Sequence, residues 1–148
     1  MEWLALACED RHVNEVELRR AIYAHFRLTG RAPTAEGLGV DAAALQRLAA
    51  AHAVVLDDAG GIGFANPFAA PGAPYRATTR EGVWSAVCAW DAFGILAALD
   101  ADGTVSGSCP DCREPIEVEV SHGRVAGDDV VAHFLVPAAE WYADLAFT

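Results

Sequence analysis

The feature that most constrains the fold is an apolar run over residues 83–94 that contains one thiol and one carboxylate. Cys88 and Asp91 are three positions apart, with Trp, Val, Ala and Phe around them. In a helix this spacing places both side chains on one face, close enough to act on the same atom. A carboxylate among apolar side chains is unfavourable unless it has a partner, so Asp91 needs one. We therefore predict the main helix of the second half over residues 81–99, with this pair on one face.

Two interpretations of the pair are open from the residues alone. A thiol beside a desolvated acid suits nucleophile or soft-metal chemistry, because the thiolate is the reactive form and the carboxylate can move its proton. Alternatively, Cys88 packs as a small hydrophobic residue while Asp91 caps a helix or pairs with an arginine. A single C-x-x-D motif has too little specificity to decide between them.

Composition and charge narrow the class of partner. The chain has 148 residues, is 53% hydrophobic and carries a formal charge of -11, with ten basic residues that are all Arg. This length suits one ordinary domain or two very small ones. A strongly acidic protein is repelled by phosphate backbones and by anionic membrane surfaces, so nucleic acid and membranes are not expected partners. We find no apolar run near the ~20 residues that a spanning helix requires.

The cysteines and the first residues predict a reducing compartment. Four unevenly spaced cysteines do not form the framework of a secreted disulfide protein: Cys8, Cys88, Cys109 and Cys112. The apolar opening residues lack a basic flank and run into Glu9 and Asp10, unlike a signal peptide. We expect a cytoplasmic protein with reduced thiols.

The first half, residues 1–68, shows the order of a winged helix. The spacing predicts helices over 15–28, 34–38 and 42–52, followed by strands over 53–56 and 62–65. DNA-binding winged helices present a basic third helix to the major groove. Here that helix offers only Arg47, so we expect a structural or interaction domain.

The Pro-rich segment 66–74 predicts a domain boundary, and residues 75–148 then form the second domain. Strands are expected over 75–79, 104–108, 115–121 and 130–136, with a last helix from residue 137. The expected fold class is α+β: an N-terminal winged-helix-like three-helix domain and a C-terminal domain of mixed helix and antiparallel sheet.

A second group of candidate ligands is the C-x-x-C turn from Cys109 to Cys112. It looks like half of a zinc site, although a second C-x-x-C is missing. His122 and His133 are candidates for nitrogen ligands of a structural zinc. A redox or spare thiol pair and a plain packing role are the alternatives.

The tryptophans have a structural and a functional interpretation. We expect Trp84, Trp90 and Trp141 in the core. Alternatively, Trp84 and Trp90 wall a pocket for an apolar ligand near Cys88. We find no nucleotide-binding, zinc-protease or serine-hydrolase motif.

Several short motifs, none specific alone, occur in an order that carries a resemblance. They are Ala21-Ile22-Tyr23 with Phe26, Ala65-Asn66-Pro67-Phe68, Trp84-x-x-x-Cys88-Ala89-Trp90-Asp91-Ala92, Cys109 with Pro115-Ile116, His133-Phe134-x-Val136-Pro137 and Trp141-x-x-Asp144. Over nearly the whole chain, this order resembles the alkylmercury lyase (organomercurial lyase) family.

The resemblance implies protonolysis of a carbon–mercury bond, which releases a hydrocarbon and leaves Hg(II) on the protein. No resident cofactor is implied; the partners are a small organomercurial substrate and cellular thiols. The family's catalytic set is two cysteines and an aspartate. Cys88 and Asp91 match the first cysteine and the aspartate, and would also bind mercury. Cys109 matches a cysteine regarded as structural, and Cys112 is an addition that also joins the candidate metal ligands.

The second catalytic cysteine of the family is expected directly after a Phe-Thr pair, and Phe147-Thr148 are the last residues of this sequence. We therefore expect either that this sequence is a fragment or early-terminated product, or that Cys109 or Cys112 supplies the second thiol. Without a second thiol, we expect capture of Hg(II) or of the organomercurial with weak or no cleavage. The alternative function is a thiol-based metal-binding or sensing winged-helix regulator without lyase activity. Such a regulator would bind DNA with a steep salt dependence.

Overall fold

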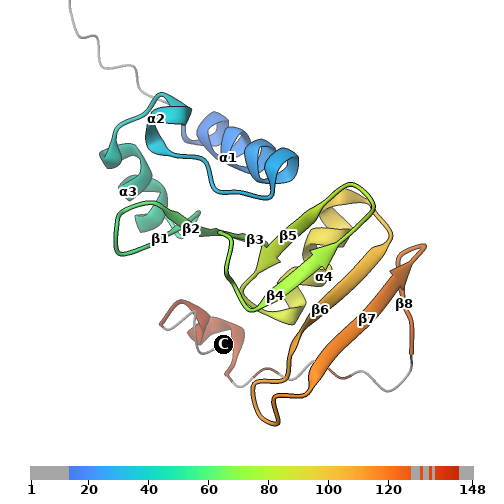
Figure 1. The fold of residues 1–148 in the computed structure, drawn as a ribbon. Coiled ribbons are helices and arrows are strands. Elements are labelled where there is room, and N and C mark those ends of the chain that lie inside the picture. The colour runs from blue at the N-terminus through green and yellow to red at the C-terminus, as the bar shows by residue number, and fades with distance from the viewer. Residues whose placement is uncertain (1–13, 128–130, 132–133, 135, 144–148) are drawn as a thin grey trace, which may run out of the picture.

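The computed structural model describes residues 14–127, 131, 134 and 136–143 as a helical layer, a sheet and one helix packed on that sheet (Figure 1). The helices are α1 (Glu15–Thr29), α2 (Ala35–Leu38), α3 (Ala42–Ala50), α4 (Ala89–Leu99) and the 3-10 helix η1 (Ala138–Ala143). The strands are β1 (Val55–Leu56), β2 (Ile62–Ala65), β3 (Phe68–Ala69), β4 (Tyr75–Thr78), β5 (Val83–Ala86), β6 (Gly103–Ser108), β7 (Pro115–Ser121) and β8 (Arg124–Val125). The α+β class is therefore as predicted.

The three N-terminal helices begin and end where local signals place them. Asn14, Thr34 and Asp41 each accept a backbone N–H in the first turn of the helix that follows. Gly30 ends α1 in the left-handed conformation, where its missing Cβ also lets it lie against the carbonyl of Val83. The predicted helix positions are confirmed to within two residues.

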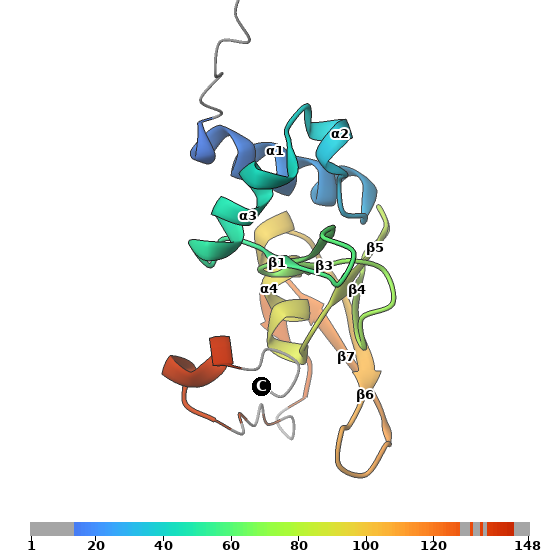
Figure 2. The same ribbon diagram turned by 90° about the vertical axis from the view of Figure 1, so that its left-hand side faces the viewer.

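The strands form one sheet in the order β1-β2-β3-β5-β4-β6-β7-β8, and every neighbouring pair is antiparallel. α4 lies against one face of its central part, as the turned view shows (Figure 2). Ala77, Val105 and Val118 are buried on the sheet. The sheet continues through segment 66–74 because β3 lies within it. The division into domains 1–68 and 75–148 stays a prediction, as does the winged-helix class of the first half.

The helix predicted over 81–99 is wrong in its first third. Val83–Ala86 is strand β5, paired with β4, and α4 begins only at Ala89. A tight turn closes the hairpin through the bond from the Thr79 amide to the Gly82 carbonyl (2.9 Å). An apolar run of this length fits a buried strand as well as a helix, and here the cross-strand partners decide. Cys88 therefore lies at the start of the helix and not within it.

The strand predicted over 130–136 is not found at its described residues. Val131, Phe134 and Val136 are outside any strand, and the others lie outside the described residues. Val131 is 85% exposed, so the apolar pattern there does not reflect a buried face. The last helix is the single 3-10 element η1.

Trp84 joins the helical layer to the sheet. Its indole Nε1 donates to the carbonyl of Phe26 (2.9 Å) and approaches that of Arg27 (3.2 Å), both in the last turn of α1. The Phe26 carbonyl also accepts the Gly30 amide (2.8 Å), so the indole adds a second donor at the end of α1. The ring of Phe26 in turn stacks on Phe68, with centroids 5.7 Å apart. The core is thus continuous from α1 to the strand that precedes Cys88.

Trp84→Phe is expected to lower the free energy of unfolding by about 2 kcal/mol, because the indole hydrogen bonds to the Phe26 and Arg27 carbonyls are lost. Urea denaturation measures the change. Trp90→Phe is the matched control: Trp90 is 58% exposed, and the expected change is below about 0.5 kcal/mol. Equal effects of the two substitutions would contradict the linking role of Trp84.

Candidate active site

Cys88 occupies the N-cap of α4, directly after strand β5. Its backbone is extended (φ -138°, ψ 169°), and its Sγ accepts the amide N–H of Asp91 at 3.4 Å. This cap position usually holds Ser, Thr, Asp or Asn. The helix N-terminus favours negative charge, so it supports a thiolate whenever one forms.

The thiol and the carboxylate converge. Cys88 Sγ donates to Asp91 Oδ2 at 3.1 Å. Asp91 is only 6% exposed and is the only buried charged side chain in the described part of the chain. Cys88 itself is partly exposed. The arrangement places a sulfur that is partly exposed to solvent next to a buried proton acceptor.

Asn66 is the site residue whose contact sequence reasoning missed. Its Nδ2 donates to Asp91 Oδ1 at 3.3 Å, across 25 positions of the chain. Asn66 precedes Pro67 in a cis peptide bond, and Pro67 packs against Gly94 on α4. The signal available in the sequence was a single amide side chain flanked by apolar residues at 65 and 67–68. No arginine is among the hydrogen-bond partners of Asp91 in the described residues.

Burial determines where the proton rests. Burial raises the pKa of Cys88 to about 11, and the hydrogen bond and charge of Asp91 add to this, against opposing backbone amides of Asp91 and Trp90. Burial also raises the pKa of Asp91, while the bond from Cys88 lowers it. Near neutral pH, Cys88 is therefore a thiol whose proton is held toward Asp91 until another group takes the sulfur.

Alkylation by iodoacetamide is expected to distinguish the thiols. Because the thiolate is the nucleophile, the Cys88 rate should still rise about tenfold per pH unit at about pH 9. Cys109 should react faster than Cys88 near pH 7, since backbone amides of Cys112 and Asp111 lower its pKa. Peptide mass mapping over a pH series measures both. A Cys88 rate that levels off below about pH 8 would contradict this account.

The C-x-x-C turn is a separate feature at the tip of the β6–β7 hairpin. Cys109 is partly exposed and Cys112 is exposed. Within the described residues, no group of three or more His, Cys, Asp or Glu is placed to hold a metal ion. His122 instead contacts Ser121 (Oγ to Nδ1, 2.9 Å) and is not grouped with these cysteines. His133 and Cys8 lie outside the described residues.

Tyr75 of β4 lies beside the end of β6, next to the C-x-x-C turn. Its hydroxyl donates to the Ser108 carbonyl at 3.3 Å, next to Cys109. Burial raises the pKa of Tyr75, and negative charge on Cys109 or Cys88 raises it further. The phenol is therefore within electrostatic reach of both sulfurs.

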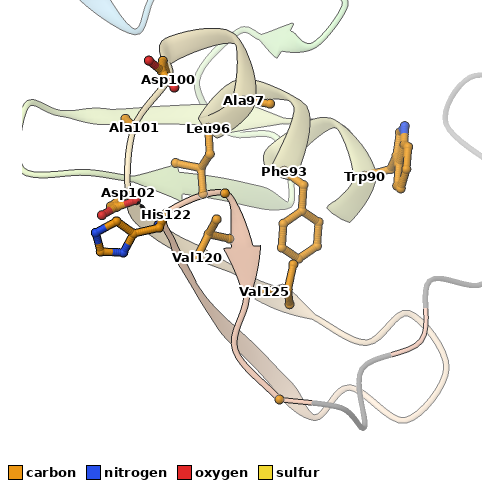
Figure 3. Close-up of a pocket in the computed structure, with 12 residues that line it drawn as sticks. Trp90, Phe93, Leu96, Ala97, Asp100, Ala101, Asp102, Val120, His122 and Val125 are labelled. Atoms are coloured by element: carbon orange, nitrogen blue, oxygen red, sulfur yellow. Dashed lines mark hydrogen bonds between the residues drawn. The ribbon is translucent and has the colours of Figure 1, made fainter.

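The tryptophans divide between core and surface. Trp84 is buried, as predicted, whereas the core prediction is wrong for Trp90, whose ring lies edge-on to Phe134 (centroids 5.9 Å apart). Phe134 stacks on Trp141 (5.3 Å), and the Trp141 indole donates to the Val136 carbonyl (3.1 Å). Trp90 is the second residue of α4 and projects away from the sheet (Figure 3).

A pocket of about 520 Å³ lies between α4 and the β7–β8 hairpin (Figure 3). Phe93, Leu96 and Val125 give it an apolar side, and Asp102 and His122 a polar end. Trp90 lines it, so one tryptophan of the predicted pocket wall does face a cavity. Cys88 and Asp91 are not among its lining residues.

Within the described residues, no helix has both the length and the apolar character needed to cross a membrane.

Comparisons with known proteins show the family of this chain. Residues 68–147, more than half of the chain and including Cys88 and Asp91, match the alkylmercury lyase (MerB) family. Among solved structures, the chain is similar to a crystal structure of the mercury-bound form of MerB2, with 24% identity and a TM-score of 0.62. The match covers 76% of this chain and 58% of that one, so the chain spans less than two thirds of its length. No curated protein matches significantly. On the family match, the chain belongs to the alkylmercury lyase family.

Proposed function

We propose that this protein cleaves carbon–mercury bonds by protonolysis, with Cys88 as mercury ligand and Asp91 as proton carrier. The observation that carries the proposal is the 3.1 Å contact between Cys88 Sγ and Asp91 Oδ2 within the segment that matches the family. Mercury detoxification is the role that this activity would serve.

The first step is capture of an organomercurial R–Hg–SR′, where SR′ is a small thiolate. Mercury is a soft metal and prefers thiolate ligands. The Cys88 sulfur bonds to mercury while its proton moves to Asp91 Oδ2, already its acceptor. The N-terminus of α4 and the Asp91 amide support the sulfur as it loses its proton.

The second step transfers that proton to carbon. The carbon–mercury bond breaks, its electron pair takes the proton from Asp91, and R–H leaves. Mercury remains as Hg(II) between Cys88 and SR′, so no oxidant or reductant is needed. The raised carboxyl pKa suits this step, because a more basic carboxylate takes up the thiol proton more readily before it passes that proton to carbon. Burial of Asp91 keeps the proton from solvent.

Small thiols are proposed as the source of the second sulfur. In the described part of the chain, Asp91 is the only side chain that hydrogen-bonds to Cys88. Each added thiolate pushes electron density toward mercury and makes the attached carbon easier to protonate. This requirement fits a cytoplasmic protein in a pool of reduced thiols. No resident cofactor is proposed.

The N-terminal half is proposed as a structural winged-helix-like domain. Its helix α3 carries Arg47 as its only basic residue, too little for a phosphate-binding surface. α1 instead supplies Phe26, whose carbonyl accepts a hydrogen bond from the indole N–H of Trp84. Trp84 belongs to β5, the strand that leads to Cys88. No observation favours the metal-sensing regulator.

The test is release of benzene from phenylmercury acetate by the purified chain at increasing glutathione concentration, followed by gas chromatography. Benzene should form faster than with glutathione alone and should increase with glutathione until the second-sulfur step saturates. A rate equal to that of glutathione alone at every concentration would overturn the proposal.

A further inference from the structure

The turn that joins β6 and β7 contains the two thiols of Cys109 and Cys112. The backbone amides of Cys112 and Asp111 lower the pKa of the Cys109 thiol, and the Cys112 side chain lowers it further. The Cys109 amide donates to the Glu114 carbonyl (2.8 Å), and the Arg113 amide to the Cys109 carbonyl (3.0 Å). Arg113 adopts a left-handed conformation (φ 65°), which closes the turn. Cys109 and Cys112 thus lie in one hydrogen-bonded turn.

Strand pairing places this turn at the same edge of the sheet as Cys88, the edge where β5 and β6 end. β5 and β6 are both antiparallel to β4, which lies between them, so they run in the same direction. Ala86 pairs with Tyr75, and the Tyr75 ring lies against Gly107 of β6. Cys88 lies two residues after Ala86, and Cys109 lies two residues after Gly107. Two strand spacings put their backbones roughly 10 Å apart.

The ligand set points to one kind of cation. A structural zinc site needs four ligands, whereas in the described residues no third His, Cys, Asp or Glu is placed to hold a metal ion together with this pair. Hg(II) is soft and is satisfied by two thiolates in a near-linear arrangement. The Cys112 thiol also lies 3.7 Å from Glu114 Oε2, an acceptor for the proton that metal binding releases.

We propose that Cys109 and Cys112 form a second, two-thiolate site for Hg(II), separate from Cys88 and at the same edge of the sheet. The choice of Hg(II) rests on the proposed function. Loading is thiol exchange: both cysteine sulfurs bond to mercury, its two small thiolate ligands leave, and these take up the two cysteine protons. No electrons are transferred.

The experiment uses reduced protein in which Cys8→Ser and Cys88→Ser leave only the turn thiols. Mercuric chloride is supplied in excess glutathione, and protein-bound mercury is measured after gel filtration. One Hg(II) per chain is expected to remain bound. Adding Cys112→Ser should lower retention at least about tenfold, because the second sulfur then has no intramolecular advantage over glutathione. Asp111→Asn is the matched control: it alters the same turn, keeps both thiols and should retain mercury.

Two results would overturn the proposal. One is equal retention with and without Cys112. The other is a collapse of benzene release in Cys112→Ser with Cys88 intact, because the turn would then belong to the cleavage step. Failure of the proposed lyase function is distinguishable, since it leaves mercury retention by the turn unchanged.

Discussion

Cys88→Ser is expected to lower benzene release from phenylmercury to the rate of glutathione alone, a loss of roughly 100-fold or more. The substitution removes the protein's mercury ligand and the proton that Asp91 receives from it. A serine hydroxyl keeps a cap for α4, since serine is a preferred N-cap residue. The fold should therefore persist, and circular dichroism with urea unfolding checks this directly.

Cys8→Ser is the matched control for Cys88→Ser. Cys8 lies outside residues 68–147, the segment that matches the family. Benzene release should be unchanged at saturating glutathione. If both serine variants lost activity equally, or if Cys88→Ser kept its activity, the assignment of the mercury ligand to Cys88 would be wrong.

Asp91→Asn is expected to spare mercury uptake at Cys88 while slowing benzene release about 100-fold to 10,000-fold, the usual contribution of a positioned acid–base group. An amide keeps the shape of the side chain but cannot carry the thiol proton to carbon. Rapid-quench measurement of bound mercury and of benzene on the same samples separates the two steps.

The Asp91→Asn variant should fold at least as well as the parent. Burial raises the folded pKa of Asp91, so the ionised carboxylate opposes folding, and this cost appears as pH rises through the unfolded pKa toward the folded one. A neutral amide avoids that cost at neutral pH. Asp100→Asn, at the left-handed C-cap of the same helix, is the matched control and should leave benzene release unchanged. Equal rates for Asp91→Asn and Asp100→Asn would exclude Asp91 as the proton carrier.

Local sequence information was enough to find the reactive pair, but not the strand and the helix N-terminus on which the pair lies. The three-residue spacing of Cys88 and Asp91 brings them together both within a helix and, as found, at its N-cap. Periodicity did not reveal strand β5, because a short apolar run fits either structure until its pairing with β4 is known. The helix caps at Asn14, Thr34 and Asp41 depend on adjacent residues, which is why those helices were predictable.

Contacts between distant segments lay beyond the reach of sequence patterns. The bond from Asn66 to Asp91 depends on how the β2–β3 turn meets α4, and no spacing encodes that meeting. The exposure of Trp90 likewise depends on which side of α4 faces the sheet. The common sheet edge of Cys88 and Cys109 follows from strand order alone.

Intact-mass and peptide mass spectrometry after one equivalent of phenylmercury in excess glutathione tests the central claim most directly. The chain used carries Cys112→Ser, which removes the proposed second mercury site. The account predicts that this chain carries mercury without phenyl, bound through Cys88, whereas the same chain with Asp91→Asn carries the intact phenylmercury group at that residue. Phenylmercury left intact on the chain with Asp91, or mercury bound elsewhere with Cys88 unmodified, would contradict it.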